Sequence, residues 1–210
     1  MIDEGYIKYR CDWQQKSVVK PDEITTLNHW RTRLYQLGLI GQYNNGIGFG
    51  NISCRLSPQN SFIVSGTQTG GMPELTSEHY TKVTTFDCQQ NYLVCEGAIK
   101  ASSESLTHGA IYESNPDNNA VVHVHHLKLW QQLLNKVPTT DPNCEYGTPQ
   151  MAAQIAKLSK LTVDKNQLNQ DQSNQDKIII MSGHQEGVIT FGQDLQEAGD
   201  KLLKYLNIWT

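Results

Sequence analysis

The spacing of apolar side chains changes along this chain, and each spacing predicts a kind of element. In residues 21–38, Ile24, Leu27, Arg31 and Leu34 fall on one side of a helix, with acidic residues in the first turn and a glycine at the end. Four later segments show helical spacing or composition, and we predict a helix in each: 102–114, 127–134, 148–160 and 195–209.

Strand-like runs lie between these helices. One hairpin is predicted over residues 51–66, with a turn at 57–60, and a second hairpin over residues 81–95. Three more strands are predicted at 120–126, 178–183 and 187–192, and the polar stretch between Asn166 and Lys177 is predicted to be a surface loop. Hairpins mixed with helices, without regular strand–helix alternation, predict an α/β fold of the α+β type with a largely antiparallel sheet.

Length, charge and cysteine content narrow the class of protein. The 210 residues suffice for one domain with a substantial core, so we expect residues 1–210 to form a single domain. The 17 Lys and Arg are scattered among 21 Asp and Glu, so no basic stripe favours nucleic acid as a partner. No apolar run approaches the roughly 20 residues of a membrane-spanning helix, and the first residues lack a signal-peptide core. We therefore expect a cytoplasmic protein with no membrane partner.

Two histidines on one predicted strand are the first candidates for chemistry. Successive side chains of a strand point to opposite faces, so His123 and His125 share a face and their imidazoles converge. A lone strand histidine is usually a satisfied polar residue, whereas two converging imidazoles favour a metal ion. His184 lies in a glycine-flanked loop, where a solvated histidine without a ligand role is the alternative explanation. Glu104 lies near the start of a predicted helix, where an acidic residue that suits the helix dipole is the alternative explanation.

Other residues of similar type are expected to have ordinary roles. His29, His79, His108 and His126 are interpreted as polar residues without a ligand role. The glycines of residues 46–50 follow a helix and precede a strand, which is the reverse of the order in a dinucleotide-binding loop, so no nucleotide cofactor is expected. The five cysteines contain no C-x-x-C pair, which argues against a cysteine-based zinc site.

Five motifs together resemble the class II aldolase/adducin family: GNISCRL, IVSGT, SSE, NPDNNAVVHVHH and a later H-x-x-G-V-I. The resemblance covers residues 22–207 and implies a three-layer α/β/α fold. It also implies a zinc-type site with His123, His125, His184 and Glu104 as ligands, which manganese, cobalt or iron would also suit. In similar aldolases the glutamate leaves the metal when substrate arrives, so Glu104 would also be the catalytic acid or base.

The resemblance further implies a pocket for a substrate phosphate. Its residues would be Gly50, Asn51, Ser65, Gly66, Ser102 and Ser103. These residue types suit an anion, because glycines let it approach backbone N–H groups, and hydroxyls and an amide donate hydrogen bonds. Plain helix capping is the alternative explanation for the two serines at 102 and 103.

The implied function is that of a zinc-dependent lyase, an aldolase, acting on a small phosphorylated sugar through a metal-stabilised enediolate. Dehydration or epimerisation of a sugar phosphate would use the same intermediate. Adducin-like members keep the fold in a non-catalytic, protein-binding role and lack the metal ligands, and a purely structural metal is a third alternative. Family members commonly form cyclic tetramers, so a homotetramer is implied.

Two departures from the family pattern bear on the reaction. The stretch between His125 and Tyr146 is shorter than in sugar-phosphate aldolases, where it supplies a tyrosine to the active site of the neighbouring subunit, and no tyrosine occurs here between Tyr112 and Tyr146. The usual His-Gly at the third histidine is replaced by His184-Gln-Glu-Gly187, which changes the loop around one expected ligand.

Overall fold

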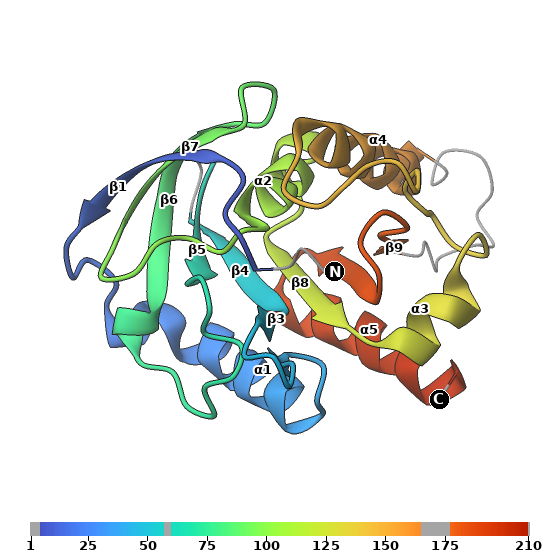
Figure 1. Cartoon of the computed structure of the whole chain (residues 1–210), viewed down its shortest axis with the longest axis horizontal. Coiled ribbons are helices and arrows are strands. Elements are labelled where there is room, and N and C mark those ends of the chain that lie inside the picture. The colour runs from blue at the N-terminus through green and yellow to red at the C-terminus, as the bar shows by residue number, and fades with distance from the viewer. Residues whose placement is uncertain (1–4, 57–59, 165–176, 210) are drawn as a thin grey trace.

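The computed structural model describes residues 5–56, 60–164 and 177–209. Residues 57–59 of the turn predicted at 57–60, and residues 166–176 of the predicted polar loop, lie outside these residues. Within them, the chain forms a layered arrangement of a large sheet and helices (Figure 1).

An eight-stranded sheet forms the centre of the described part of the chain, in the order β1-β7-β6-β5-β4-β8-β10-β9. Its strands are β1 (Arg10–Gln15), β4 (Asn51–Leu56), β5 (Ser61–Ser65), β6 (Tyr80–Asp87), β7 (Tyr92–Gly97), β8 (Ala120–His125), β9 (Ile178–Ile180) and β10 (Gly187–Gly192). All neighbouring strands run antiparallel except β1 and β7, which are parallel. The predicted largely antiparallel sheet is therefore confirmed.

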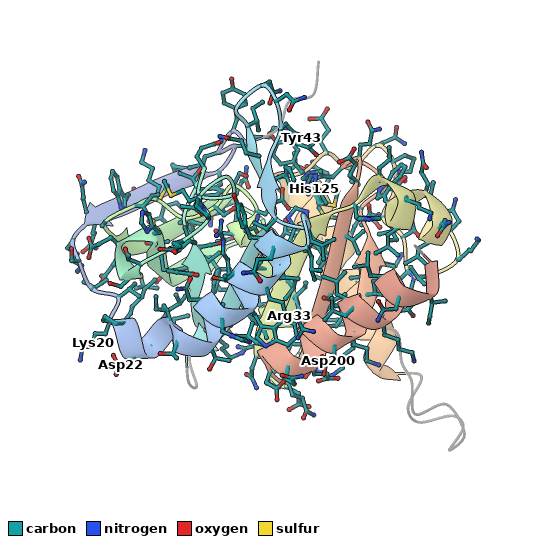
Figure 2. All side chains as sticks on the ribbon, turned by 90° about the horizontal axis from the view of Figure 1, so that it is seen from below. Lys20, Asp22, Arg33, Tyr43, His125 and Asp200 are labelled. Atoms are coloured by element: carbon teal, nitrogen blue, oxygen red, sulfur yellow. The ribbon has the colours of Figure 1, made fainter. Side chains whose placement is uncertain are left out.

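Helices cover both faces of the sheet. They are α1 (Thr25–Gln36), which follows the 3₁₀ helix η1 (Pro21–Ile24), α2 (Ser105–Ser114), α3 (Leu127–Leu133), α4 (Pro149–Asp164) and α5 (Leu195–Trp209), with a short 3₁₀ helix η2 (Ser77–His79). Apolar side chains of α1, α3 and α5 join one core layer, and those of α2 and α4 join the other. Figure 2 shows α1 and α5 side by side on one face of the sheet. The α/β/α arrangement is thus confirmed, and none of the described helices has the length and apolarity needed to cross a bilayer.

Strand β1 was not expected from the sequence. Only its alternate residues Cys11 and Trp13 are half-buried, and the others are exposed. The strand pairs in parallel with β7, and the Trp13 indole N–H donates to the carbonyl of Gly97 at 3.0 Å. Because this edge strand is held by a partner some 80 residues away, a local pattern of apolar residues carries little information about it.

A small hairpin lies between α1 and β4. Strand β2 (Gly41–Gln42) pairs antiparallel with β3 (Gly48–Phe49) in a separate two-stranded sheet. The ring of Phe49 lies directly over Gly41, where a side chain would collide with it. This hairpin joins α1 to β4 and, as shown below, reaches the candidate site.

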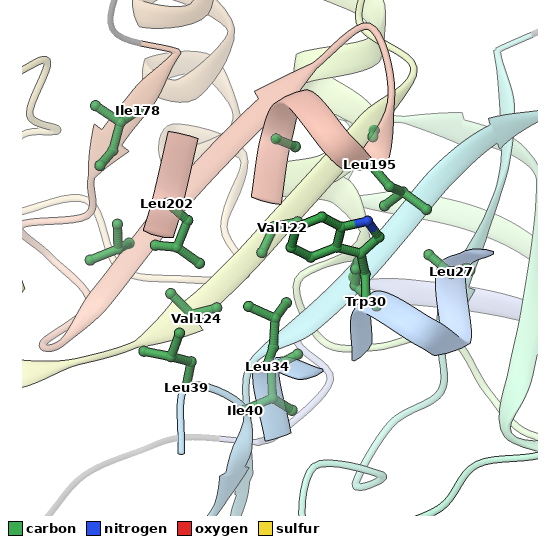
Figure 3. Packing of buried hydrophobic residues seen from close by; sticks show 14 of the residues in the cluster. Leu27, Trp30, Leu34, Leu39, Ile40, Val122, Val124, Ile178, Leu195 and Leu202 are labelled. Carbon is green, nitrogen blue, oxygen red and sulfur yellow. The ribbon is translucent and has the colours of Figure 1, made fainter. Parts of the chain in front are cut away.

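The core explains why the central strand presents its histidines to one side only. Val122 and Val124 of β8 are fully buried in the layer with α1 and α5, and Val121 points into the layer with α2 and α4. Figure 3 shows the indole of Trp30 from α1 lying between Val122 and α5. Since side chains alternate along a strand, His123 and His125 must share the α2 and α4 side with Val121.

The contact between Trp30 and Gly199 of α5 gives a stability prediction. A β-carbon at Gly199 would overlap the indole ring. Helix propensity favours alanine over glycine by about 1 kcal/mol, but overpacking a dense core costs about 1 to 3 kcal/mol. We expect Gly199→Ala to lower the free energy of unfolding by about 1 kcal/mol or more in urea titrations. Asn207 is exposed on the same helix, and Asn207→Ala should leave the free energy of unfolding unchanged. A Gly199→Ala protein as stable as wild type would contradict the packing argument.

Candidate active site

Three imidazoles meet at one end of the sheet. His123 and His125 extend from the second half of β8, and His184 lies in the turn between β9 and β10. Their ring centroids are 4.7 to 5.2 Å apart, and one nitrogen of each ring lies within 4.8 Å of the others. All three side chains are buried. The structure therefore brings together the three histidines that the sequence suggested as ligands.

Glu104 reaches the same cluster from the α2 side of the sheet. It is the N-cap residue of α2 and is buried, and its Oε1 lies 3.7 Å from Nδ1 of His184. The other carboxylate oxygen, Oε2, accepts a hydrogen bond of 2.9 Å from the hydroxyl of Thr107, one turn along the helix. A carboxylate at a helix N-terminus is also favoured by the helix dipole. The fourth expected ligand thus lies beside the cluster, held in place by its own helix.

Burial favours the neutral form of the two histidines on β8. Burial lowers the pKa of His123 well below its usual range, and the nearby His125, His184 and His108 rings lower it further. Burial, and next the His184 ring, lower the pKa of His125 in the same way. Neutral imidazoles carry the lone pairs that metals require. The Nε2 atom of His123 is buried and has no hydrogen-bond partner among the described residues. These features fit a divalent metal ion.

The residues expected to bind phosphate surround the same cleft, which encloses about 410 Å³ including its open mouth. Its wall contains five of them: Gly50, Asn51, Gly66, Ser102 and Ser103. Gly50 has a φ of +75°, and a β-carbon there would press on Ile40. Ser65 lies behind the wall, buried, and its hydroxyl accepts a hydrogen bond from the Ile52 N–H at 3.2 Å.

One backbone donor expected for the anion is already engaged. The N–H of Gly66 donates to the carbonyl of His79 at 2.8 Å. Gly66 therefore contributes to the cleft by allowing close approach, because a side chain there would collide with Ile99. The hydroxyls of Ser102 and Ser103, before the first turn of α2, are better placed to donate to an anion.

Comparison with known proteins now assigns the family. A family model described as the class II aldolase and adducin N-terminal domain matches residues 36–206. The chain belongs to the class II aldolase and adducin family. A 3-oxo-tetronate 4-phosphate decarboxylase of Haemophilus influenzae is 29% identical over 161 residues, which cover 73% of this chain and 71% of that protein.

Solved structures of the class II aldolase family share the fold. An L-fuculose 1-phosphate aldolase superposes with a TM-score of 0.65 at 16% identity, covering 92% of this chain and 87% of the other. A sugar-phosphate aldolase from Thermotoga maritima gives a TM-score of 0.63 at 20% identity, covering 90% and 93% of the two chains. At these identities the likeness establishes the architecture and leaves the reaction open.

Several residues at this aldolase-family site were not singled out from the sequence. Tyr146 lines the cleft, and its ring centroid lies 4.8 Å from that of His184. Tyr43 contacts His125, and Thr107 holds Glu104. The i, i+3 spacing of Glu104 and Thr107 on a helix was a local signal for their contact. Tyr43 and Tyr146 reach the site from distant segments, and no local pattern marks them.

A buried arginine shapes another wall of the cleft. The guanidinium of Arg31 in α1 donates to the carbonyls of Thr69 and Gly70, at 2.7 and 3.0 Å, and to that of Pro73 at 3.3 Å. Residues 67–70 line the cleft. The helical face that contains Arg31 was expected to be mainly apolar, and the arginine is buried in it because these carbonyls satisfy its N–H groups.

His108, interpreted above as a polar residue without a ligand role, lies close enough to His123 to affect its pKa. It is fully buried, its Nδ1 lies 2.7 Å from the hydroxyl of Ser53, and that hydroxyl lies 2.6 Å from Tyr112 OH. Two of the other histidines cap helices: His79 accepts from Thr76 N–H, and His126 from Leu129 N–H.

The buried His108 gives a pH prediction. Burial lowers its pKa to about 3, whereas an unfolded histidine titrates near 6.5. Below about pH 6.5 the unfolded chain binds a proton that the folded chain excludes, so the free energy of unfolding decreases as the pH is lowered, until about pH 3. Between pH 7 and pH 5 we expect His108 to account for about 2 kcal/mol of the lost unfolding free energy. In urea titrations with chelator present, wild type should lose about 2 kcal/mol more unfolding free energy than His108→Gln between pH 7 and pH 5. Equal losses in the two proteins would contradict the assigned role of His108.

Proposed function

We propose that this chain is a metal-dependent carbon–carbon lyase that acts on a small phosphorylated sugar or sugar acid. The observation that carries the proposal is the cluster of three buried imidazoles beside Glu104, in a cleft whose wall also presents Asn51, Ser102 and Ser103. The names of the relatives support it, because those compared above are a decarboxylase and aldolases of phosphorylated sugars or sugar acids. We also propose a cytoplasmic homotetramer, as the family resemblance implies.

His123, His125 and His184 would hold the metal, with Glu104 as a fourth ligand before substrate binds. Zinc suits three imidazoles and a carboxylate, and manganese, cobalt and iron also fit this donor set. When bound, the ion supplies a Lewis acid that stabilises negative charge developing on substrate oxygens. The remaining steps fall to side chains of the chain itself.

Glu104 is the proposed acid and base. Its carboxylate is buried, one oxygen is held by Thr107 at 2.9 Å, and the other faces the imidazole cluster. Glu104, protonated from solvent, would deliver its proton to the carbon from which carbon dioxide has departed, and its carboxylate would then regain a proton from water. Ser102, Ser103 and the N-terminus of α2 would bind the phosphate, which fixes the position of that carbon relative to Glu104.

Within this class we place decarboxylation of a 3-oxo sugar-acid phosphate first and aldol cleavage second. Loss of carbon dioxide starts from a carboxylate that is already deprotonated, so the bonding pair moves to carbon without a base acting on a hydroxyl. Aldol cleavage needs such a base and an additional proton-transferring group. Residues 126–145, the segment that supplies a tyrosine in similar aldolases, contain none here, and the curated relative is a decarboxylase. Dehydration, epimerisation and a non-catalytic adducin-like role are the alternatives.

The metal site predicts the metal content of the protein. Purified without an affinity tag and supplied with zinc, wild type should bind about one ion per chain. His123→Ala removes one of the converging imidazoles and should lose most of that metal, as measured by plasma mass spectrometry. The matched control is His79→Ala, which removes a capping histidine outside the cleft and should retain the ion. Wild-type protein without metal after reconstitution would favour the non-catalytic role.

The proposed role of Glu104 as proton donor predicts that its replacement lowers the rate of catalysis. With 3-oxo-tetronate 4-phosphate as substrate, wild type should release carbon dioxide, and Glu104→Gln should lower kcat about 10²- to 10⁴-fold because it removes the proton donor. The exposed carboxylate Glu145, changed to Gln, is the control and should leave kcat unaltered. Cleavage of sugar phosphates to aldehydes without carbon dioxide release would favour aldol cleavage, and a fully active Glu104→Gln would refute the assigned role.

A further inference from the structure

A chain of two hydrogen bonds lies behind one of the clustered imidazoles. Nδ1 of His125 is 2.9 Å from the hydroxyl of Tyr43, and that hydroxyl donates to Oε2 of Glu186 at 2.9 Å. Figure 2 shows Tyr43 and His125 at the same end of the molecule. The three residues come from the β2–β3 hairpin, the end of β8 and the turn before β10. No single segment therefore determines the arrangement.

The direction of these bonds follows from proton counting. A tyrosine hydroxyl has one proton, and Tyr43 donates it to Oε2 of Glu186, so that proton lies on the side of Glu186. The hydroxyl oxygen is then the acceptor toward His125, and the imidazole must carry its proton on Nδ1. This leaves the lone pair on Nε2, the opposite nitrogen of the ring, available to the cluster.

Aromatic packing fixes the same ring from a second direction. The ring of Phe49 packs against both other rings, with its centroid 4.6 Å from that of Tyr43 and 5.4 Å from that of His125, while the Tyr43 and His125 centroids are 6.2 Å apart. The turn of the hairpin is closed by backbone hydrogen bonds of 2.9 Å between Tyr43 and Ile47 and between Gly46 and Tyr43. The Tyr43 hydroxyl is thus supplied by an ordered hairpin.

The backbone at Glu186 indicates that its carboxylate is placed for a reason. Its φ is +69°, in the left-handed region that glycine adopts without cost and other residues adopt rarely. The conformation is held by the N–H of His126, which donates to the Glu186 carbonyl at 3.0 Å. Strained conformations of this kind persist where the surroundings enforce them, often at functional sites. Here the strained residue is the one that orients Tyr43.

We propose that Tyr43 and Glu186 form a positioning relay that holds His125 in the Nδ1-protonated tautomer, with Nε2 directed at the metal, and thereby sets the metal affinity. The inference rests on the proposed metal site. Both residues act through His125 and neither is expected to touch the metal. Partners behind a metal-binding histidine typically change metal affinity about 10- to 100-fold when removed.

The test measures zinc affinity by competition with a chromophoric chelator, and thermal stability in parallel. Tyr43→Phe should weaken zinc binding about 10- to 100-fold. Glu186→Gly should also weaken it, yet the metal-free variant should not melt below the metal-free wild type, because glycine adopts the positive φ without steric cost. A purely structural role would lower both quantities together. The cobalt-substituted variants should show a changed visible absorption spectrum, which reports the ligand geometry directly.

A double variant and a matched control complete the design. Since Glu186 acts through the Tyr43 hydroxyl, the Tyr43→Phe, Glu186→Gly double variant should bind zinc no more weakly than Tyr43→Phe alone. Tyr92→Phe removes another tyrosine–carboxylate bond, 2.7 Å to exposed Asp12 far along the sheet, and should leave zinc affinity unchanged.

The outcomes separate this inference from the proposed function. If wild type binds zinc and both Tyr43→Phe and Glu186→Gly bind it within about twofold of wild type, far from the expected change, the relay is overturned and the metal site stands. If wild type binds no zinc, the metal site fails and the relay fails with it. If Tyr43→Phe does not fold, the affinity of Glu186→Gly still decides.

Discussion

The alternation of side chains along β8 is the constraint on which the site depends. Val122 and Val124 are fully buried against the layer that contains α1 and α5. This packing fixes the register of the strand, because a slip by one residue would exchange its two faces. His123 and His125 are consequently forced toward the α2 side, where Glu104 caps the helix. The apolar core on one face thus positions the candidate metal ligands on the other.

Burial also determines how charge is distributed in the cleft. Desolvation lowers the pKa of His123 and of His125 and keeps both rings neutral, and the residues described as lining the cleft include no lysine or arginine. A phosphate there would be held by hydroxyls, an amide and a helix N-terminus, which are neutral donors. Under the proposed function, the metal would supply a full positive charge in a cleft whose described lining has no cationic side chain. Such a cleft avoids the cost of burying a cationic side chain when no substrate is bound.

The sequence predicted the parts of the fold that are determined locally. The hairpin over 81–95, the strand with His123 and His125, and the helix after Glu104 have strong periodicity, and the structure contains them. Strand β1 was missed because its edge position leaves alternate residues exposed and its partner is distant in sequence. Tyr43 was missed for a similar reason, since its role appears only when the hairpin folds over the end of β8. Local patterns report elements, whereas contacts between elements require the fold.

The shared fold positions the residues that mark the family, whereas the reaction also depends on segments that connect the elements of the fold. Residues that would hold the metal and transfer the proton lie on β8, on α2 and in the turn before β10, which the whole fold positions. The choice between releasing carbon dioxide and releasing an aldehyde depends on one more proton transfer, and hence on a side chain from a connecting segment. The segments that connect helices and strands vary more among related proteins than the helices and strands themselves. In this chain residues 126–145 contain no tyrosine, and this is one reason why the proposed function places decarboxylation before aldol cleavage.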